Sequence, residues 1–296
     1  MCFSNEQASR VGAAPVGCVG LAQRQVRRPG QPQQPQQPQQ PQRLRGALAR
    51  RLAGVRAAVL AALLAAGLGM ATAGSNALAA SLTPLVGAGD APQPPWQFAG
   101  LPQQSLPRTS YRIAALDGER VLRIEAQASY GNLVHALPVG VAPRRLAWRW
   151  RLDQANAAAD LRQKAGDDSA VKVCLLFDLP LSAVPFFERQ LLRLARSQTA
   201  EPLPAATLCY VWDARLAPDT AIDNAYSRRV RYLVLRGPEA PLRGWLSEQR
   251  DVRVDFLRLF GDETSSLPPL LAVAVAGDAD NTGGRSLAHI ASISLD

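Results

Sequence analysis

The chain has 296 residues and a formal net charge of +9, from 33 Lys and Arg against 24 Asp and Glu. Nine of the basic residues but only one acidic residue fall within residues 1–79, so the rest of the chain has a net charge of +1. Because nucleic-acid binding needs basic charge on the folded part of a protein, this distribution argues against a nucleic-acid partner.

Residues 1–80 are predicted to form a leader that does not join the fold. Residues 1–56 are basic and of low complexity, with QPQQPQQPQQPQ at 31–42, which cannot form a packed core. Residues 57–80 contain an apolar run of roughly 14 residues, too short for a membrane span, and then Ala77-Leu78-Ala79. This order is typical of a secretory signal. It predicts a periplasmic or secreted protein whose mature chain has no stable membrane span.

The signal-like segment lies unusually far from Met1. Two explanations fit: translation begins downstream of Met1, or the basic region before the apolar run is unusually long. An uncleaved segment that anchors the protein to the inner membrane is the alternative to a cleaved signal. Mass spectrometry of the mature N-terminus distinguishes them, because a product that begins at Met1 would contradict export by cleavage.

After the leader, the sequence shows the two-residue alternation of β-strands. Residues 81–107, rich in Pro, Gly and Gln, are predicted to be a linker or an extended lead-in segment. In residues 120–129, Leu122, Ile124, Ala126 and Ala128 share one face, which is typical of a half-buried antiparallel strand. An Asp-Gly turn at 117–118 predicts a hairpin with residues 111–116. Further strands are expected at 131–137, 145–152, 171–178, 207–213, 229–236, 250–256, 270–276 and 286–295.

About ten short strands separated by turns predict one all-β domain over residues 108–296, an antiparallel, jelly-roll-like β-sandwich. One short helical insertion interrupts the pattern at residues 185–198. There Phe187, Leu191, Leu194 and Gln198 recur at helical spacing, and Pro185 suits the first turn of a helix. We expect this helix to cover an edge or an end of a sheet. A role at a membrane surface is the functional alternative.

Basic residues on the polar faces of the strands are the first candidates for a ligand site. In residues 145–152 the two tryptophans share the apolar face, which predicts core positions, while Arg149 and Arg151 share the other face. Lys172 and Arg231 also occupy polar positions of their strands. Side by side, these side chains would form a basic concave face that binds carboxylate or phosphate oxygens. The alternatives are exposed tryptophans that stack on sugar rings, and arginines held in scattered cross-strand ion pairs.

Acidic residues mark two loops. Asp167 and Asp168 precede the strand at 171–178. Adjacent residues of a strand point to opposite faces, so the two carboxylates cannot both serve one site unless the backbone turns there. A ligand role for Asp168 and a purely structural turn are the two interpretations. Residues 277–284 read GDADNTGG, in which Asp278, Asp280 and Asn281 are candidates for binding ligand hydroxyl groups. Asp278 and Asp280 are also candidate calcium ligands, because the segment opens like an EF-hand loop. It lacks the glutamate at the twelfth position and is flanked by predicted strands, so simple turn formation is the alternative.

Two cysteines, Cys174 and Cys209, follow the leader, and each lies in a predicted strand. In an exported protein they form a disulfide if their strands are neighbours, or they stay buried as free thiols. The sequence contains no nucleophile elbow, HExxH, phosphate loop or dinucleotide-binding glycine pattern. With His135 and His289 as the two histidines of the chain, a zinc site is not expected. We therefore predict no catalytic residue.

Several motifs are distinctive in combination. The first are AWRWRL at 147–152 and the GDD at 166–168, which is followed four positions later by Lys172. The others are Phe177-Asp178, Tyr210-Val211-Trp212, Asn224 with Tyr226, Arg229-Val230-Arg231, Trp245, Arg250-Asp251-Val252 with Asp255, Phe260-Gly261 and residues 278–282. Together, from Trp96 to Leu295, they resemble a bacterial exported family catalogued as domain of unknown function 3047 (DUF3047). The chain departs from that family in having Lys172 where arginine is expected and in its Gln-rich leader. The resemblance implies export, and it implies no reaction, ligand or catalytic residue.

The sequence therefore predicts a non-catalytic periplasmic protein that binds a carbohydrate or another envelope-derived ligand. The basic candidates would bind ligand oxygens, and the acidic ones would bind hydroxyl groups or a structural calcium ion. The first alternative is a glycan-active hydrolase or lyase on the same scaffold. A hydrolase would need two carboxyl groups facing each other across one cleft. The candidates for that pair are Asp168, Asp178, Asp255 and Asp278. The second alternative is a structural envelope protein without a small ligand.

Overall fold

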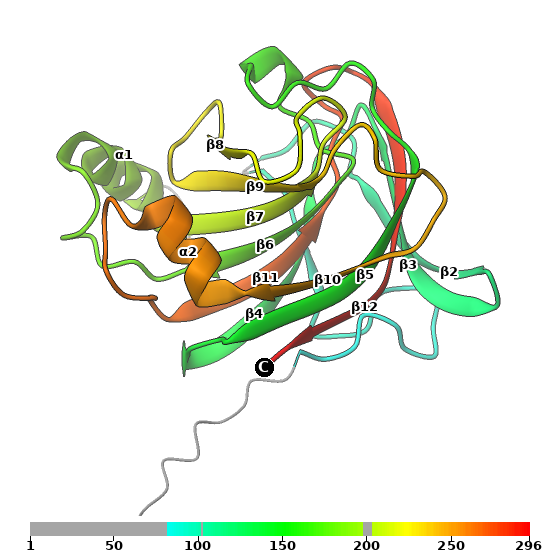
Figure 1. The fold of residues 1–296 in the computed structure, drawn as a ribbon, viewed down its shortest axis with the longest axis horizontal. Helices are drawn as coiled ribbons and strands as arrows, with labels where there is room; N and C mark the ends of the chain where they lie inside the picture. The colour runs from blue at the N-terminus through cyan, green and yellow to red at the C-terminus, as the bar shows by residue number, and fades with distance from the viewer. Residues whose placement is uncertain (1–81, 102, 198–202) are drawn as a thin grey trace, which may run out of the picture. The chain divides into compact units, whose positions relative to one another are not determined.

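The computed structural model describes residues 82–101, 103–197 and 203–296, whose fold is shown in Figure 1. The predicted leader segments, residues 1–56 and 57–80, lie outside the described residues. Within the described ranges, no helix has both the length and the apolar character needed to cross a membrane. Two β-sheets pack face to face around an apolar core, which confirms the predicted jelly-roll-like sandwich.

The larger sheet has seven strands. Their order is β1 (Gln97–Ala99), β4 (Asn132–Val141), β11 (Leu270–Ala276), β6 (Val171–Phe177), β7 (Ala206–Trp212), β9 (Val230–Arg236) and β8 (Ala221–Asp223). The order in the five-stranded sheet is β10 (Leu246–Asp251), β5 (Arg145–Gln154), β12 (Arg285–Leu295), β3 (Glu119–Gln127) and β2 (Ser110–Leu116). Neighbouring strands are antiparallel except β7 and β9, which run parallel. The three-residue strands β1 and β8 were not predicted, because so short a run carries no alternation signal.

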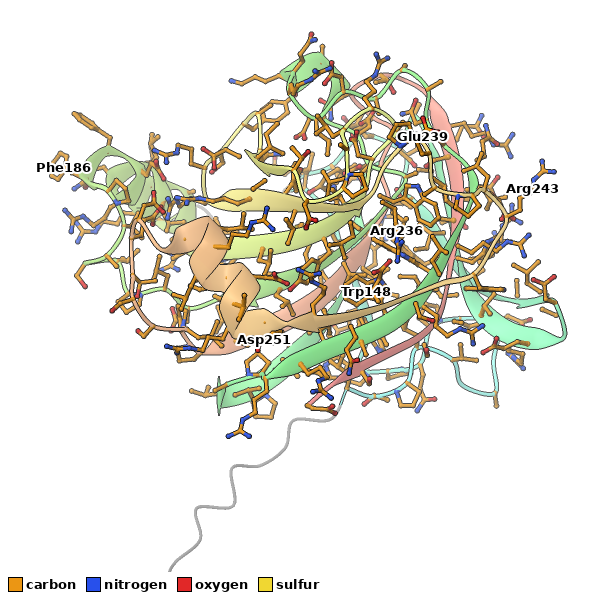
Figure 2. All side chains as sticks on the ribbon, in the orientation of Figure 1. Trp148, Phe186, Arg236, Glu239, Arg243 and Asp251 are labelled. Carbon is orange, nitrogen blue, oxygen red and sulfur yellow. A yellow bond between two sulfur atoms is a disulfide. The ribbon has the colours of Figure 1, made fainter. Side chains whose placement is uncertain are left out.

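The core between the sheets is built on the alternation in β5. Leu146, Trp148, Trp150 and Leu152 point inward, and each is at most 2% exposed. Trp148 lies between the two sheets (Figure 2), with its ring centroid 5.2 Å from that of Tyr210 on β7. Aromatic pairs of this kind contribute about 0.5–1.5 kcal/mol beyond the burial of their area. The prediction that the tryptophans belong to the core is confirmed, and the alternative of an exposed stacking platform is wrong.

Two α-helices lie at one end of the sandwich, where the sequence predicts one (Figure 1). The predicted helix at 185–198 is confirmed as α1 (Phe186–Ser197). The predicted strand at 250–256 is wrong: β10 ends at Asp251, and α2 (Val252–Phe260) begins there. The Asp251 side chain accepts a hydrogen bond from the Val254 amide at 3.0 Å and so caps the helix. The buried residues Val252, Phe256 and Phe260 recur at a spacing of four, a helical period that the short alternating run concealed.

The central strands of the larger sheet are buried on both faces. All seven residues of β7 are buried, and the outer face carries a second apolar cluster that includes Cys174, Cys209 and Val211. Leu161, which is 1% exposed, belongs to that cluster and comes from the segment between β5 and β6. This segment, with the short 3₁₀ turn η1 (Lys164–Gly166), therefore covers part of the outer face. Polar side chains on the same face, next to this segment, are consequently buried.

Candidate functional site

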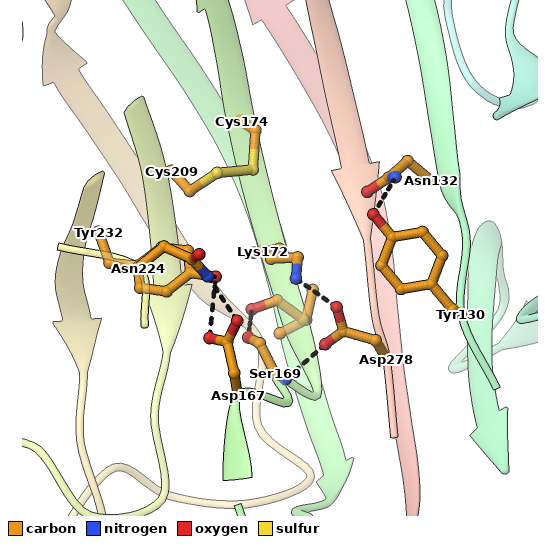
Figure 3. Close-up of a disulfide and its surroundings, with 11 residues drawn as sticks. Tyr130, Asn132, Asp167, Ser169, Lys172, Cys174, Cys209, Asn224, Tyr232 and Asp278 are labelled. Atoms are coloured by element: carbon orange, nitrogen blue, oxygen red, sulfur yellow. Dashed lines mark hydrogen bonds and ion pairs between the residues drawn. A yellow bond between two sulfur atoms is a disulfide. The ribbon is translucent and has the colours of Figure 1, made fainter. Parts of the chain in front are cut away.

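A cluster of polar side chains lies on the outer face of the seven-stranded sheet, at the N-terminal end of β6 (Figure 3). Lys172 of β6 stands between Ala276 of β11 and Val211 of β7, its partners in strand register. The lysine is 7% exposed, and its Nζ contacts a carboxylate oxygen of Asp278, which follows β11. The two ends of adjacent strands thus bring together a cation and an anion that are more than 100 positions apart in the chain.

Asp278 is fixed by the backbone as well as by the lysine. Its Oδ1 accepts a hydrogen bond from the Ser169 amide at 2.6 Å, and the Asp278 amide donates to the Ser169 carbonyl at 2.9 Å. Burial, the largest single influence, would lower the pKa of Lys172, but the Asp278 carboxylate together with Tyr232 and Tyr130 holds that pKa well above its usual value. The ammonium group therefore stays charged, and the pair forms a buried ion pair with its geometry set by the β6 and β11 termini.

Asp167 lies beside this pair and has a different environment. Its carboxylate accepts hydrogen bonds from Asn224 Nδ2 at 2.5 Å and from the Tyr232 hydroxyl at 3.2 Å. Burial raises the pKa of Asp167 to about 6, although the nearby Lys172 charge and the two hydrogen bonds act to lower it. Perturbed carboxyl groups of this kind gather at functional sites more often than elsewhere. Asp167 is thus a buried carboxyl group whose pKa lies well above its ordinary value of 3.8.

Asp168 points away from Asp167 and joins two loops. Its carboxylate accepts from the Thr282 amide at 2.9 Å, the Thr282 hydroxyl at 2.5 Å, the Asn281 amide at 3.1 Å and Asn156 Nδ2 at 3.3 Å. These bonds tie the segment before β6 to residues 277–284, as expected of the structural alternative. The carboxylates of Asp167 and Asp168 have no hydrogen-bond donor in common.

An exposed aromatic ring stands at the border of the cluster. Tyr226 is 57% exposed, and its hydroxyl lies 2.6 Å from Asn281 Oδ1 and 3.0 Å from the Lys164 carbonyl. The Lys164 ammonium group lies 5.4 Å from the centroid of the ring. Nearby, Asp280 Oδ1 is inaccessible to solvent and has no hydrogen-bond partner in the described part of the chain, and burial raises the pKa of this carboxyl group. The border therefore combines an exposed aromatic ring with a nearby carboxylate oxygen that is buried and lacks a donor.

The disulfide lies next to the cluster. Cys174 and Cys209 are directly opposite each other in the register of β6 and β7 and are bonded, which decides between the two alternatives left by the sequence. Cys174 is two positions from Lys172 and on the same face, so the bond packs beside the ion pair (Figure 3). A structural disulfide is characteristic of proteins that fold in an oxidising, extracytoplasmic compartment.

The predicted basic face is not formed, because its members lie in three places. Arg149 and Arg151 project from β5 on the outer face of the five-stranded sheet, where they contact the carboxylates of Glu119 at 3.3 Å and Asp117 at 2.6 Å. Arg231 lies at the end of β9 next to α2, and its guanidinium group contacts Asp262 and Glu263. Lys172 alone joins the cluster described above. The basic candidates are therefore engaged in separate ion pairs, each with carboxylates of its own neighbourhood.

Of the candidates in the two loops, Asp168, Asp278, Asp280 and Asn281 come together with Lys172. Asp278 uses both oxygens on protein donors, and the described residues contain no group of three or more His, Cys, Asp or Glu that could hold a metal ion. The calcium site at Asp278 and Asp280 therefore stays a prediction. The sequence analysis named Asn224 and Tyr226 only as marks of the family resemblance, and it missed Tyr232 and the place of all three in the cluster, because they follow no spacing rule. They meet the cluster only through the pairing of β8, β9 and the loop between them.

The four candidates for the carboxylate pair of a hydrolase lie in three places. Asp255 lies inside the sandwich, bonded to the Tyr210 hydroxyl at 2.9 Å and to Arg250 at 2.7 Å. Asp178 follows the opposite end of β6. Asp168 and Asp278 remain near the cluster, but protein donors occupy both carboxylates. One open hollow lies apart from this cluster, lined by residues of β8, by Arg231 and by α2, and the arginine there is already paired with Asp262 and Glu263.

The fold and the cluster define a jelly-roll-like β-sandwich with a buried polar site on the outer face of its larger sheet. The chain belongs to the family described as "Protein of unknown function (DUF3047)", whose model matches residues 94–294. No curated protein matches the chain.

Solved structures with a similar fold are distant from this chain. TmCBM61, solved in complex with β-1,4-galactotriose, has 10% identity and a TM-score of 0.27, covering 69% of this chain and 88% of its own. Endoglucanase 3 of Trichoderma harzianum, from family GH12, has 10% identity and a TM-score of 0.35, covering 69% and 98%. The K2 cleaved adhesin domain of Lys-gingipain has 8% identity and a TM-score of 0.25, covering 69% and 84%. Likenesses of this size concern the fold and carry no argument about ligand or reaction.

Proposed function

We propose that the protein is a non-catalytic extracytoplasmic binding protein whose ligand is a carbohydrate or another hydroxyl-rich molecule derived from the cell envelope. The observation that carries the proposal is the exposed ring of Tyr226, which its hydroxyl holds at the border of a polar cluster. A sugar offers both an apolar face for an aromatic ring and hydroxyl donors for carboxylate oxygens. The disulfide between Cys174 and Cys209 supports the extracytoplasmic location.

The balance of donors and acceptors favours a neutral ligand. The Lys172 charge is compensated by Asp278, so the lysine offers no net positive charge to an anionic ligand. Asp280 Oδ1 has no donor, and the carboxylate of Asp167 has lone pairs beyond its two hydrogen bonds. These acidic groups disfavour a phosphate or carboxylate ligand at the border of the cluster, whereas a neutral ligand carries no opposing charge. This reverses the expectation from sequence that arginine and lysine donors bind ligand oxygens.

Tyr226 supplies the apolar part of the proposed site. An exposed aromatic ring is costly to order unless something holds it, and here the hydroxyl and the Asn224 side chain, which accepts from the Tyr226 amide at 2.9 Å, fix its position. A ring that is ordered before binding loses little conformational freedom when a ligand stacks on it. The catalytic alternative lacks a comparable observation, because Asp168 and Asp278 are both held by protein donors.

A glycan array probed with the full-length protein tests the proposal. We expect binding to a neutral oligosaccharide, and we expect Tyr226→Ala to weaken that binding by at least about tenfold, as for loss of a central aromatic contact. Tyr226→Phe, which keeps the ring, should retain most of the affinity. Trp245→Ala is the matched control, because this half-exposed aromatic residue lies beside Arg149 on the other sheet. Absence of glycan binding, or binding that depends on Trp245 and not on Tyr226, would contradict the proposal.

A further inference from the structure

Helix α1 turns most of its apolar side chains toward solvent. Phe186, Phe187, Leu191 and Leu194 are 59%, 81%, 67% and 58% exposed, whereas Leu192 is buried. At 100° per residue the four exposed side chains fall within an arc of about 140° on the helix, in which Gln190 and Ser197 also lie between Phe186 and Leu194. Phe186 projects from the helix away from the sandwich, as Figure 2 shows. A contiguous apolar face of this kind marks an interaction surface, since scattered exposed residues would not share one arc.

The outward orientation of this face is fixed by contacts on the opposite side of the helix. Leu192 packs into the core cluster, and Glu188 contacts Arg229 at 2.5 Å. Near the C-terminal end, Arg196 Nε donates to the Leu203 carbonyl at 2.9 Å. Because these anchors include a buried apolar contact and a buried arginine, rotation of the helix to bury the phenylalanines would break them. The exposed apolar arc, defined by Phe186, Phe187, Leu191 and Leu194, is therefore a stable feature of the fold.

Positive charge borders the apolar arc. Arg189 and Arg193 lie at one edge of the arc on the helical wheel. Glu188, the acidic residue of α1, forms ion pairs with Arg229 and Arg228. Arg189 lies with its guanidinium carbon 5.7 Å from the Phe186 ring centroid and has no carboxylate within ion-pair distance in the described residues. Phenylalanine and leucine on one arc with arginine at its edge are typical of helices that lie in the interfacial region of a bilayer.

We propose that α1 docks the protein onto a lipid surface that carries anionic headgroups. The apolar arc would enter the boundary between headgroups and acyl chains, while Arg189 and Arg193 contact lipid phosphates. Charge complementarity favours this occupant over a second copy of the chain. A symmetric contact through the same face would bring the arginine pairs of both copies together without a neighbouring carboxylate on α1 to compensate them.

The docking is tested with the full-length protein, so that every variant carries the same residues 1–80 and the difference between variants reports on α1. In vesicle sedimentation, phosphatidylcholine vesicles with phosphatidylglycerol should bind the wild type more strongly than vesicles without it. Phe187→Ser/Leu191→Ser should weaken binding by more than about tenfold, because two apolar side chains no longer enter the bilayer. The matched control is Leu101→Ser/Leu242→Ser, which removes exposed leucines outside α1 and should bind as the wild type does.

A fluorescence measurement isolates the contact of α1 itself. In Phe187→Trp, the new indole should shift to shorter wavelength on vesicle addition and be quenched by brominated acyl chains. The native Trp96, Trp148, Trp150 and Trp212 are at most 5% exposed, and the half-exposed Trp245 is replaced (Trp245→Phe) in the variant and in its reference protein, so the background stays unquenched. Unaltered vesicle binding by the serine variant, or absence of quenching, would overturn the proposal. It would also be overturned by an indole already blue-shifted without vesicles, because another protein surface would then cover the arc.

Discussion

Replacing Lys172 by methionine should destabilise the protein strongly. Methionine matches the length of the lysine stem but leaves the Asp278 carboxylate, whose side chain is 4% exposed, without its cation. Removal of one partner of a buried ion pair costs about 3–5 kcal/mol, because the remaining charge has lost both its partner and water. For a domain of this size, that loss lowers the melting temperature by roughly 6–20 °C. The Ser169 amide still donates a hydrogen bond to Asp278 in the variant, so we expect the loss of stability to lie near the lower end of the range of about 3–5 kcal/mol.

Urea unfolding at neutral pH, followed by the fluorescence of the core tryptophans, measures this loss. Lys172→Met/Asp278→Asn is the diagnostic companion, because it removes both charges and keeps an acceptor for Ser169. It should be more stable than Lys172→Met alone. A single variant that loses less than about 1 kcal/mol, or a double variant that is no more stable, would refute the buried-pair reasoning.

Two further predictions concern the neighbours of this pair. The pKa of Asp167 is about 6 in the folded protein against 3.8 ordinarily. The stabilisation that protonated Asp167 gives to the folded state is therefore fully present below pH about 4, and it is lost as the pH rises through 6. Asp167→Asn should remove this loss from stability curves measured across that range, and an unchanged curve would contradict the assignment. Cys174→Ala/Cys209→Ala opens a loop of 35 residues and should lower the free energy of unfolding by about 3–4 kcal/mol in urea titrations, whereas an unchanged midpoint would contradict a structural bond.

The sandwich was predictable because each long strand has one face in the core. In β5 the alternation of leucine and tryptophan with arginine predicts which face is buried, and the leucine and tryptophan side chains are buried in the structure. Helix α2 was not predictable in the same way. Over residues 250–256 the alternation of valine with charged residues resembles a strand, and the helical period appears only when Phe260 is included. The capping interaction of Asp251 is a local signal that distinguishes the two.

The candidate site was predictable in part. The loop at 277–284 and the acidic pair at 167–168 stand out by composition, and they do meet at Lys172. Which arginines join them depends on which sheet each strand enters, and a period of two residues gives the face of a strand but not its sheet. Arg149 therefore shares its strand pattern with Lys172 and lies on the opposite side of the sandwich. Asn224 and Tyr226 reach the cluster through the strand order β7-β9-β8, which includes a parallel pair that local patterns do not encode.

The central claim places a ligand between Tyr226 and the polar cluster around Lys172 and Asp278. Amide hydrogen exchange of the full-length protein, with and without the oligosaccharide that binds it most tightly on the array, tests the claim most directly. The account predicts protection of residues 222–228 and 277–284, which carry Tyr226 and Asp278, with no change on the outer face of β5. Protection centred on β5 and residues 243–249, around Arg149 and Trp245, would contradict it.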